Sequence, residues 1–508
     1  MLRPQVFALF ENEDVQIGLI CSEKQAIDAT LQGLAKEDNR FSPIADKYWN
    51  ARGGSHTDGG AFIFNIENVN GQDSVKRLTC KDKFGSVVST NGKWKYCDMT
   101  IDISAPEDEN PLKKQLSELA ETGRAIELFS YLRDNIVSWD YNTFRWSLNE
   151  LKILADGSDE YKGAIIEALT LLNDRRYDTG DKKRSSILRI IRETLHDIFT
   201  ATPSLEFGIR GYECHYRFIN WETRKLLRAP NDGEEVLVIN AEGFPPEGEA
   251  CDARLICEAY NLGWKQFIIY GYKGQRFCGC GLGPETEDVR IDVYDSSGDY
   301  LASGIDGLEI YVHGNGQDQL GQIMKAGKLV VFGDVGQTFM YGAKGGEVYI
   351  MGNAAGRPLI NAVGKPRVVI NGACLDYLAE SFMAGEPLDG GGFVVLNGIY
   401  FDDKGRIQEQ STPYPGSNLF SLASGGAIYV RDPHQQLVEE QLNGGEFAPL
   451  ASEDWELILP YLKENEQLFG ISIENDLLTV DGIKKSPAEV YRKVRAIKLA
   501  VLTEENSH

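Results

Sequence analysis

The feature that most constrains this sequence is a phrase of about twenty residues that recurs between Ile291 and Pro433. Each repeat is a short aliphatic run closed by glycine or a small polar residue, as in IDVYD, EIYVHG, LVVFG, VYIMG, VVING, FVVLNG and, later, IYVRD. The closing residues, here called markers, are spaced by 19, 19, 19, 20, 26 and 34 residues, and they are Asp295, Gly314, Gly333, Gly352, Gly372, Gly398 and Asp432. A fixed period near twenty is typical of a solenoid.

The composition of one repeat predicts how it folds. Its β-branched and aromatic run favours a strand, and the glycines beside it are expected to supply positive φ at sharp corners. A second apolar spot, such as Phe339-Met340, provides another inward wall. One coil cannot bury its apolar face alone, so neighbouring coils must stack. Helices are disfavoured, because a glycine in a helix interior costs roughly 1 kcal/mol relative to alanine. We therefore expect a β-helix with stacked ladders that contain Leu329, Val331, Val348 and Ile350.

Charge and hydropathy exclude several classes of partner. The chain has 508 residues and a formal net charge of −24, so nucleic acid and anionic membrane, which need a basic face, are not expected partners. It contains no apolar run of eighteen residues, and its first residues lack the pattern of a signal peptide. A cytoplasmic location is the expectation.

Nine cysteines are scattered along the chain without a CxxC spacing, and the near pairs are Cys251 with Cys257 and Cys278 with Cys280. This pattern does not favour a zinc or iron–sulfur site, because both kinds of site usually take closely spaced ligands. An odd number of cysteines without a signal peptide indicates reduced thiols. No cofactor is expected to bind to this chain.

The chain divides into four segments with different patterns. Residues 1–105 indicate a mixed α/β domain, with strands at Val6–Phe10, Val15–Ile20 and Ala61–Phe64 and a helix at Ser22–Ala35. Residues 106–234 are mainly helical, with a strand-rich end and a linker. Residues 235–432 carry the repeats, led by a strand at Val236–Ile239, a helix at Asp252–Leu262 and a strand at Phe267–Tyr270. Residues 433–508 form a small α/β extension, in which Ser486 caps the start of a helix.

The glycine phrases of the repeats resemble those of a known family. The phrase from Lys273 to Gly283 (KGQRFCGCGLG) comes first, and the signature glycines follow as Gly314-x-Gly316, Gly342-x-x-Gly345-Gly346 and Gly385. Residues 235–432 thereby resemble the GXGXG domain, which closes the large subunit of glutamate synthase and is shared by one of the subunits of formylmethanofuran dehydrogenase. The resemblance implies a right-handed β-helix that packs against catalytic domains and holds them in register.

Departures from glutamate synthase limit what the resemblance implies. That enzyme releases ammonia with an amino-terminal cysteine nucleophile, whereas this chain begins Met1-Leu2-Arg3-Pro4 and its first cysteine is Cys21. The flavin-binding barrel and its cysteine cluster have no counterpart. FMN and iron–sulfur clusters are therefore assigned to partner chains.

Several residues could carry chemistry, and each has a structural alternative. The loop at residues 52–60 holds His56 and Asp58 and could cradle a phosphate or present a base, but it lacks the P-loop frame, and a surface turn is the preferred interpretation. Cys278 and Cys280 are two residues apart, hence on one side of a strand. They could serve redox or metal chemistry, but the preferred interpretation is that they are small inward-facing residues of a narrow coil.

The repeat region offers a few further candidates. His313 ends a strand just before Gly314, where a turn role is the default. The carboxylates Asp318, Asp376 and Glu380 could act as paired acids of a polysaccharide-cleaving enzyme, but they fall at different positions within their coils. Six glycines of the repeats are interpreted as structural turn residues: Gly314, Gly316, Gly333, Gly352, Gly372 and Gly398.

Together these patterns predict a multidomain α+β chain: a mixed α/β start, a helical segment, a right-handed β-helix and a small extension. The expected function is a non-catalytic scaffold or accessory subunit of a glutamate-synthase-like oxidoreductase, docked to other subunits of a redox or amidotransfer complex. A homo-oligomer is also compatible with the sequence. The alternatives are an enzyme with its site between the amino-terminal domain and the β-helix, and a formylmethanofuran-dehydrogenase-like subunit of a metal–pterin complex.

Overall fold

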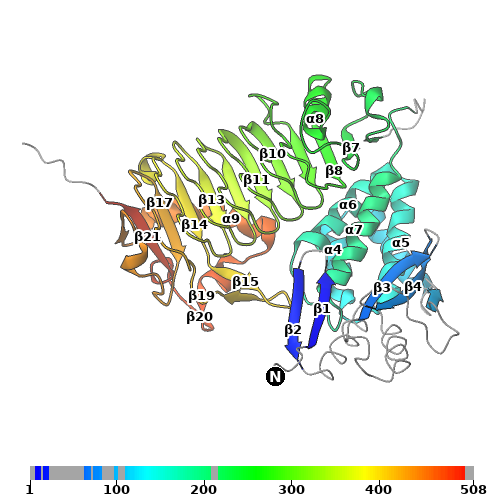
Figure 1. Cartoon of the computed structure of the whole chain (residues 1–508), viewed down its shortest axis with the longest axis horizontal. Helices are drawn as coiled ribbons and strands as arrows, with labels where there is room; N and C mark the ends of the chain where they lie inside the picture. The colour runs from blue at the N-terminus through cyan, green and yellow to red at the C-terminus, as the bar shows by residue number, and fades with distance from the viewer. Residues whose placement is uncertain are drawn as a thin grey trace, which may run out of the picture. The chain divides into compact units, whose positions relative to one another are not determined.

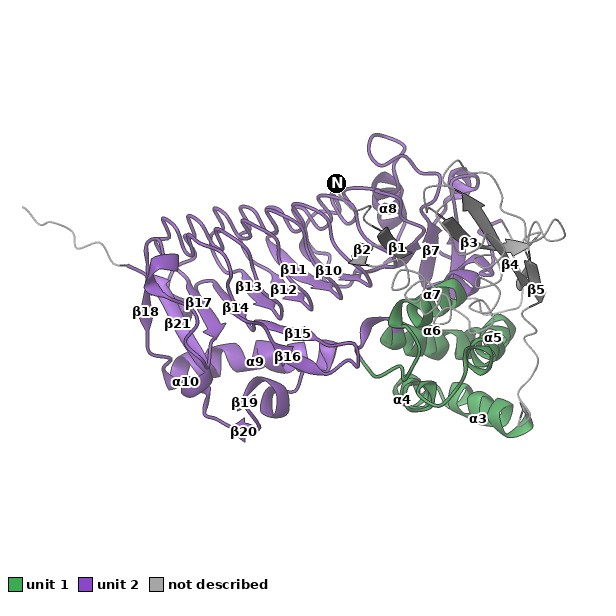
Figure 2. Cartoon of the chain, turned by 60° about the horizontal axis from the view of Figure 1, so that its bottom comes forward, with its two compact units in different colours: residues 1–172, 177–195 green, residues 173–176, 196–508 purple. Residues whose placement is uncertain are grey.

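A computed structural model describes residues 6–12, 15–21, 62–69, 72–82, 97–100, 109–206 and 215–497 of the chain. The chain forms two compact units (Figure 2): residues 1–172 with 177–195, and residues 173–176 with 196–508. The fold is mixed α/β, with one large sheet in the second unit in which parallel pairing predominates.

The first unit contains the strands predicted near the amino terminus. Strands β1 (Val6–Asn12) and β2 (Val15–Cys21) form an antiparallel pair, and β3 (Phe62–Val69), β4 (Gln72–Asp82) and β5 (Cys97–Thr100) form a second antiparallel sheet. All three predicted strands are thereby confirmed. The helix predicted at 22–35 and the loop with His56 and Asp58 lie outside the described residues.

The predicted helical segment is also confirmed. Its helices are α3 (Glu109–Glu121), α4 (Ala125–Ile136), α5 (Tyr141–Gly157), α6 (Asp159–Asp174) and α7 (Arg184–Thr200). Several apolar residues of these helices have no exposed surface, among them Leu116, Ile187, Ile191 and Leu195. The last residues of α6 and α7, from Asn173 and from His196 onward, belong to the second unit.

The second unit is organised by a twelve-stranded sheet (Figure 1). Its order is β18-β21-β17-β14-β13-β12-β11-β10-β9-β8-β7-β6, and every neighbouring pair from β6 to β17 is parallel. The strands are β6 (Tyr216–Ile219), β7 (Val236–Asn240), β8 (Gln266–Tyr270), β9 (Arg290–Val293), β10 (Asp306–Val312), β11 (Ala326–Val331), β12 (Glu347–Ile350), β13 (Arg367–Ile370), β14 (Phe393–Leu396), β17 (Ala427–Arg431), β18 (Gly445–Ala448) and β21 (Tyr491–Ala496).

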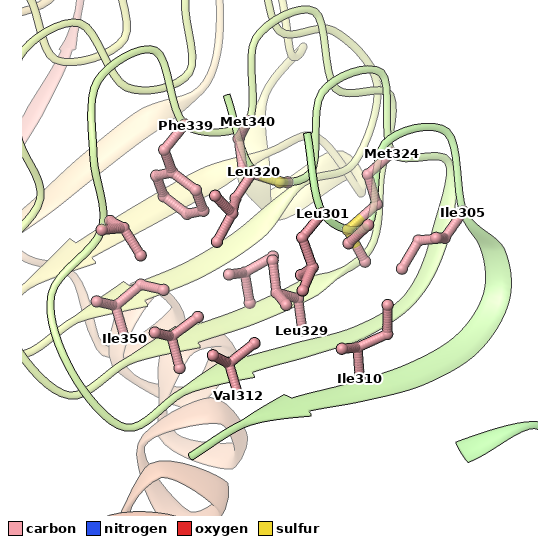
Figure 3. Packing of buried hydrophobic residues seen from close by; sticks show 14 of the residues in the cluster. Leu301, Ile305, Ile310, Val312, Leu320, Met324, Leu329, Phe339, Met340 and Ile350 are labelled. Atoms are coloured by element: carbon pink, nitrogen blue, oxygen red, sulfur yellow. The ribbon is translucent and has the colours of Figure 1, made fainter. Parts of the chain in front are cut away.

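The repeats stack as the period predicts. We call residues 290–431, which run from β9 to β17, the coil stack. Leu329 pairs with Val348 and Val331 with Ile350, and none of these four side chains is exposed, so the predicted ladders are confirmed. On a second wall of the coils, single parallel β-bridges join each coil to the next, for example from Val335 to Ala354. Figure 3 shows strand residues such as Ile310 and Leu329 facing Leu301, Leu320 and Phe339 across the interior.

One sheet separates two hydrophobic cores in this unit. Its inner face lines the coil interior, where α8 (Asp252–Asn261) contributes Leu255, Ile256 and Ala259 beside the first strands. Its outer face is packed against α9 (Ser452–Phe469) through Ile458 and Leu462. Burial on both faces explains why these strands read as continuous apolar runs. Helix α9 was not predicted from the sequence.

Shorter elements complete the second unit. They are the hairpins β15 (Ile399–Phe401) with β16 (Ile407–Glu409) and β19 (Thr479–Val480) with β20 (Ile483–Lys484), three 3₁₀ turns at Arg224–Leu226, Pro387–Asp389 and Glu439–Gln441, a π-helical turn at Ile473–Leu477, and α10 (Pro487–Val490). Helix α10 begins at the predicted Ser486 cap, but it is a single turn that leads into β21. Within the described ranges, no helix combines the length and the apolar character needed to cross a bilayer.

The predicted positive φ is confirmed for glycines at strand starts, at +99° in Gly327 and +90° in Gly346, but it is wrong for most of the glycines that follow the strands. Gly314, Gly316, Gly333, Gly352 and Gly372 do not have positive φ, and only Gly398, at +61°, does. A Cβ added to a marker glycine would instead meet the backbone of the preceding coil. The hypothetical Cβ lies 2.6 Å from Asp295 O at Gly314, 2.8 Å from Gly314 O at Gly333, and 2.9 Å from Gly333 O at Gly352. Glycine is needed there because successive markers stack too closely for a side chain.

Further positive φ angles lie at the second corner of each coil. Alternate residues there adopt them, and many are not glycine: Tyr300 and Ala302, Gln319 and Ile323, Thr338 and Met340, Arg357, Leu359 and Asn361, Tyr377, Ala379 and Ser381. In the lead-in phrase the same alternation falls on Phe277, Gly279, Gly281 and Gly283. Backbone hydrogen bonds tie these corners together, as from Thr338 N to Gly356 O at 3.0 Å and from Met340 N to Leu320 O at 2.7 Å.

Candidate functional site

Cys278 occupies an inward position of the coil interior. The Cys278 carbonyl accepts a hydrogen bond from the Ala302 N–H. In the following repeats the carbonyls of Leu301 and Leu320 accept the N–H groups of Gly321 and Met340 in the same way. Cys278 therefore takes the place that Leu301 and Leu320 hold in those repeats. Its side chain is 1% exposed. Burial raises the pKa of the Cys278 thiol well above its ordinary value, and the nearby Asp252 adds to the rise. The interpretation as a small inward-facing residue is consistent with this geometry.

Cys280 has different surroundings from Cys278. Both lie in a turn, not on one side of a strand as predicted, and Cys280 is only partly buried. Its Sγ donates to Tyr300 O at 3.2 Å. Cys257 of α8 lies against the same backbone, because its Sγ donates to Cys280 O at 3.1 Å. The sequence shows Cys251 and Cys257 as a near pair, but nothing in it placed α8 beside the lead-in phrase.

Four free cysteines lie near the junction of α8 with the lead-in phrase, close enough to affect one another's pKa: Cys251, Cys257, Cys278 and Cys280. Burial raises the pKa of Cys280 to about 12, and interaction with Cys257 and Cys251 contributes. Burial also raises the pKa of Cys257, while Arg254 opposes the rise. Cys257, Cys278 and Cys280 are thus protonated at neutral pH. Among the described side chains, no three His, Cys, Asp or Glu groups converge as metal ligands would.

A buried carboxyl group adjoins the thiols. Asp252, the first residue of α8, is fully buried. Burial raises its pKa to about 6, although the neighbouring Tyr272 hydroxyl and backbone N–H groups partly oppose the rise. Neither oxygen of Asp252, nor the Tyr272 hydroxyl, makes a hydrogen bond of ordinary geometry with another described residue. Polar atoms buried in this way are uncommon in native structures.

His313 lies in a buried network of charges. Its Nδ1 lies 2.8 Å from Asp174 Oδ2 and its Nε2 lies 3.1 Å from Asp292 Oδ1. Burial lowers its pKa, but the two carboxylates, Asp174 first, outweigh burial and raise it to about 9. Burial likewise acts against the charge of Asp292, yet hydrogen bonds from His313 and Arg290 bring its pKa down to about 2. His313 lies in the bend directly after β10, as predicted, and its ring in addition bridges two carboxylates, which the sequence did not indicate.

A second histidine approaches the first marker. His196 Nε2 lies 3.5 Å from Asp295 Oδ2, and the His196 ring packs on Tyr270 with centroids 5.0 Å apart. Asp295 has φ of +77°, and its carboxylate accepts the Gly271 N–H at 2.9 Å. Both His196 and Asp295 are partly exposed. His196 was not predicted as a site residue, since it lies in a helical pattern about a hundred residues from its partner.

The candidate carboxylates of the repeats have a structural role. Asp318 Oδ1 accepts the Gln337 N–H at 2.7 Å, and Asp376 Oδ1 accepts the Ser417 N–H at 2.7 Å, so each ties one coil to the next. Glu380 contributes its backbone carbonyl, which accepts the Asn361 N–H. Because Asp318 and Asp376 are engaged along the stack, the geometry does not favour a pair of catalytic acids.

The family predicted from the glycine phrases is confirmed for the repeat region. Residues 269–480 match the family model described as "GXGXG motif". The match begins in β8 and continues past the coil stack to β19, so it includes α9 on the outer face of the sheet. This part of the chain is a GXGXG region.

A relative from an archaeon covers a similar share of the chain. The uncharacterized protein MJ1350 of Methanocaldococcus jannaschii is 29% identical over 230 residues, which are 44% of this chain and 82% of that protein. Most of that protein therefore corresponds to less than half of this chain. Its name carries no statement about activity.

Proposed function

We propose that this chain is a non-catalytic scaffold or accessory subunit of a glutamate-synthase-like, multi-subunit oxidoreductase in the cytoplasm. In this proposal the coil stack is a right-handed β-helix that docks and positions catalytic partner chains. The match to the GXGXG family over residues 269–480 supports it. The parallel pairing supports the handedness, since crossovers between parallel strands of one sheet are almost always right-handed.

The observation that carries the proposal is the filled interior of the coil stack. Inward residues from one coil to the next have almost no exposed surface, as at Ile310, Leu329, Val348, Val368 and Val394. Such packing leaves the interior as a rigid core. The surface that can act on other molecules is then the outside of the stack, which suits docking.

The proposal places FMN and iron–sulfur clusters on the partner chains. Cluster ligation usually takes four cysteines, and among the described residues the thiols near α8 do not converge as a ligand set. Flavin phosphates often bind at a helix start with free N–H groups. Here the first residue of α8 is the buried carboxyl Asp252, which disfavours an anion.

Native purification tests the proposal. The tagged chain is isolated gently from its own cells, and co-purifying chains are identified by mass spectrometry while visible absorption reports flavin and iron–sulfur clusters. We expect flavin- and cluster-bearing partners to co-purify, and the colour to leave with them after dissociation. A chain that elutes alone, or that keeps the cofactor once its partners are removed, would overturn the proposal.

A surface variant sharpens this test. Leu422 is 74% exposed on the last coil, so Leu422→Asp changes the outside of the stack without disturbing its interior. Gly356→Ala is the control, because its Cβ would come no closer than 3.9 Å to a neighbour. If Leu422→Asp no longer co-purifies with partner chains while its melting temperature is unchanged, the partners dock at that end of the stack.

A further inference from the structure

We propose that Cys257 and Cys280 are a redox-active pair that closes into a disulfide when a peroxide oxidises the protein. This inference concerns a modification site and does not depend on the scaffold role. It identifies a pair that sequence spacing does not suggest, because the closest cysteines in sequence are Cys278 and Cys280. The bond would join α8 to the lead-in phrase of the repeats.

The contact between the two residues supports this pairing. Cys257 Sγ lies 3.1 Å from Cys280 O, and a Cβ built on Gly281 would lie 3.4 Å from the same sulfur. The sulfur therefore rests on the peptide that follows Cys280. Cys280 Sγ contacts Tyr300 O at 3.2 Å. The Cys280 side chain therefore has to change its rotamer before the two sulfurs can reach disulfide distance.

The backbone around Cys280 allows such a change. Gly279 and Gly281 flank it with φ of +78° and +86°, and glycine crosses between backbone conformations at low cost. Cys257 and Cys280 are both partly exposed, whereas Cys251 and Cys278 are buried. A small oxidant therefore reaches Cys257 and Cys280 before it reaches the other two thiols.

The chemistry balances with a peroxide as oxidant. The Cys257 thiolate attacks one peroxide oxygen, which gives a sulfenic acid and releases hydroxide or an alkoxide. Cys280 sulfur then displaces the hydroxyl of the sulfenic acid, which leaves as water after taking the Cys280 proton. Two thiols are oxidised and one peroxide is reduced. Because both thiols have a raised pKa, little thiolate is present at neutral pH, and the reaction should accelerate as pH rises.

Peptide mapping of the full-length protein tests the proposal. The protein is treated with hydrogen peroxide and digested without reduction. We expect a peptide cross-linked through Cys257 and Cys280, the loss of two free thiols, and a melting temperature about 5 °C higher that returns to its starting value with dithiothreitol. A cross-link through Cys278, or sulfinic acid at Cys257 with Cys280 still free, would overturn the proposal.

Single variants provide the controls. Cys257→Ser and Cys280→Ser should each prevent both the cross-link and the thermal shift. Cys374→Ser should change neither, since Cys374 is a buried free cysteine at a distant position of the coil stack. A thermal shift that persists in Cys280→Ser would contradict the pairing even if that variant is less stable, because only the change on oxidation is compared.

Discussion

His313 and Asp174, 139 residues apart in sequence, form a buried ion pair with Nδ1 2.8 Å from Oδ2. Both side chains are only 3% exposed. Asn173 Nδ2 also donates to the His313 carbonyl at 2.9 Å, so the end of α6 binds both the ring and the backbone of His313. Breaking one member of a buried pair leaves an uncompensated charge, which is strongly destabilising.

The stability of the second unit should therefore depend on pH through His313. Its folded pKa of about 9 lies above the ordinary value of 6.5, so its contribution is fully present below pH 6.5 and is lost as pH rises through 9. The difference between these two pKa values corresponds to about 3 kcal/mol in the free energy of unfolding. We expect the melting temperature of the wild type to fall between pH 7 and 9.5 by more than that of His313→Gln.

His434→Gln is the control for this pH dependence. His434 is 41% exposed and bonded to Glu409, and the variant should keep the wild-type fall between pH 7 and 9.5. Equal slopes for wild type and His313→Gln, measured by differential scanning calorimetry, would show that His313 does not hold its proton in this range.

The stacked marker glycines should be unusually sensitive to substitution by alanine. In Gly333→Ala the new methyl group would contact Asn315 Oδ1 and lie 2.8 Å from Gly314 O, so even this small change should destabilise the stack by about 1–3 kcal/mol. Gly333→Val should cost more. Urea unfolding followed by circular dichroism measures both, and Gly356→Ala, which has room for its Cβ, should be nearly neutral. A stable Gly333→Ala would mean that the coils are farther apart than the structure places them.

A buried amide ladder predicts a further loss. Asn371 Nδ2 donates to Asn465 Oδ1 at 2.8 Å, Asn397 Nδ2 donates to Asn371 Oδ1 at 2.8 Å, and the Tyr491 hydroxyl donates to Asn397 Oδ1 at 2.8 Å. Asn371→Leu removes the hydrogen bonds that Asn371 shares with Asn465 and Asn397 and should cost about 2–4 kcal/mol. Tyr491→Phe removes one hydrogen bond and should cost about 1 kcal/mol. Urea titrations that rank the two variants in the opposite order would refute this account of the ladder.

The sequence predicted the parts of the fold that repeat or have a local cause. The period placed Leu329 over Val348, because stacked coils must share a register. It could not reveal why Gly333 is glycine, since close approach and positive φ select the same residue. It also missed α9, whose apolar side chains matter only because the outer sheet face must be covered.

Contacts between distant segments account for the site residues that the sequence did not reveal. The pairing of Asp174 with His313 joins residues 173–176 to the bend after β10, and the contact of Cys257 with Cys280 joins α8 to the lead-in phrase. No spacing rule predicts these contacts, because Asp174 and Cys257 read as ordinary helix residues. Cys278 was interpretable from sequence, since its neighbours already suggested a narrow coil.

The last prediction concerns cofactors. The chain purified without partners should be colourless, with no stoichiometric flavin or iron–sulfur cluster. Among the thiols that come together near α8, Cys278 and Cys280 are held in the protonated form by burial, which raises the pKa of each, whereas a cluster needs thiolates. Anaerobic reconstitution with iron and sulfide, followed by visible spectroscopy and iron analysis, measures this directly. Cys374→Ser serves as the matched variant, because Cys374 lies outside the group. Visible absorption that survives desalting, and that Cys280→Ser abolishes while Cys374→Ser does not, would assign a cluster to this chain and contradict the scaffold role.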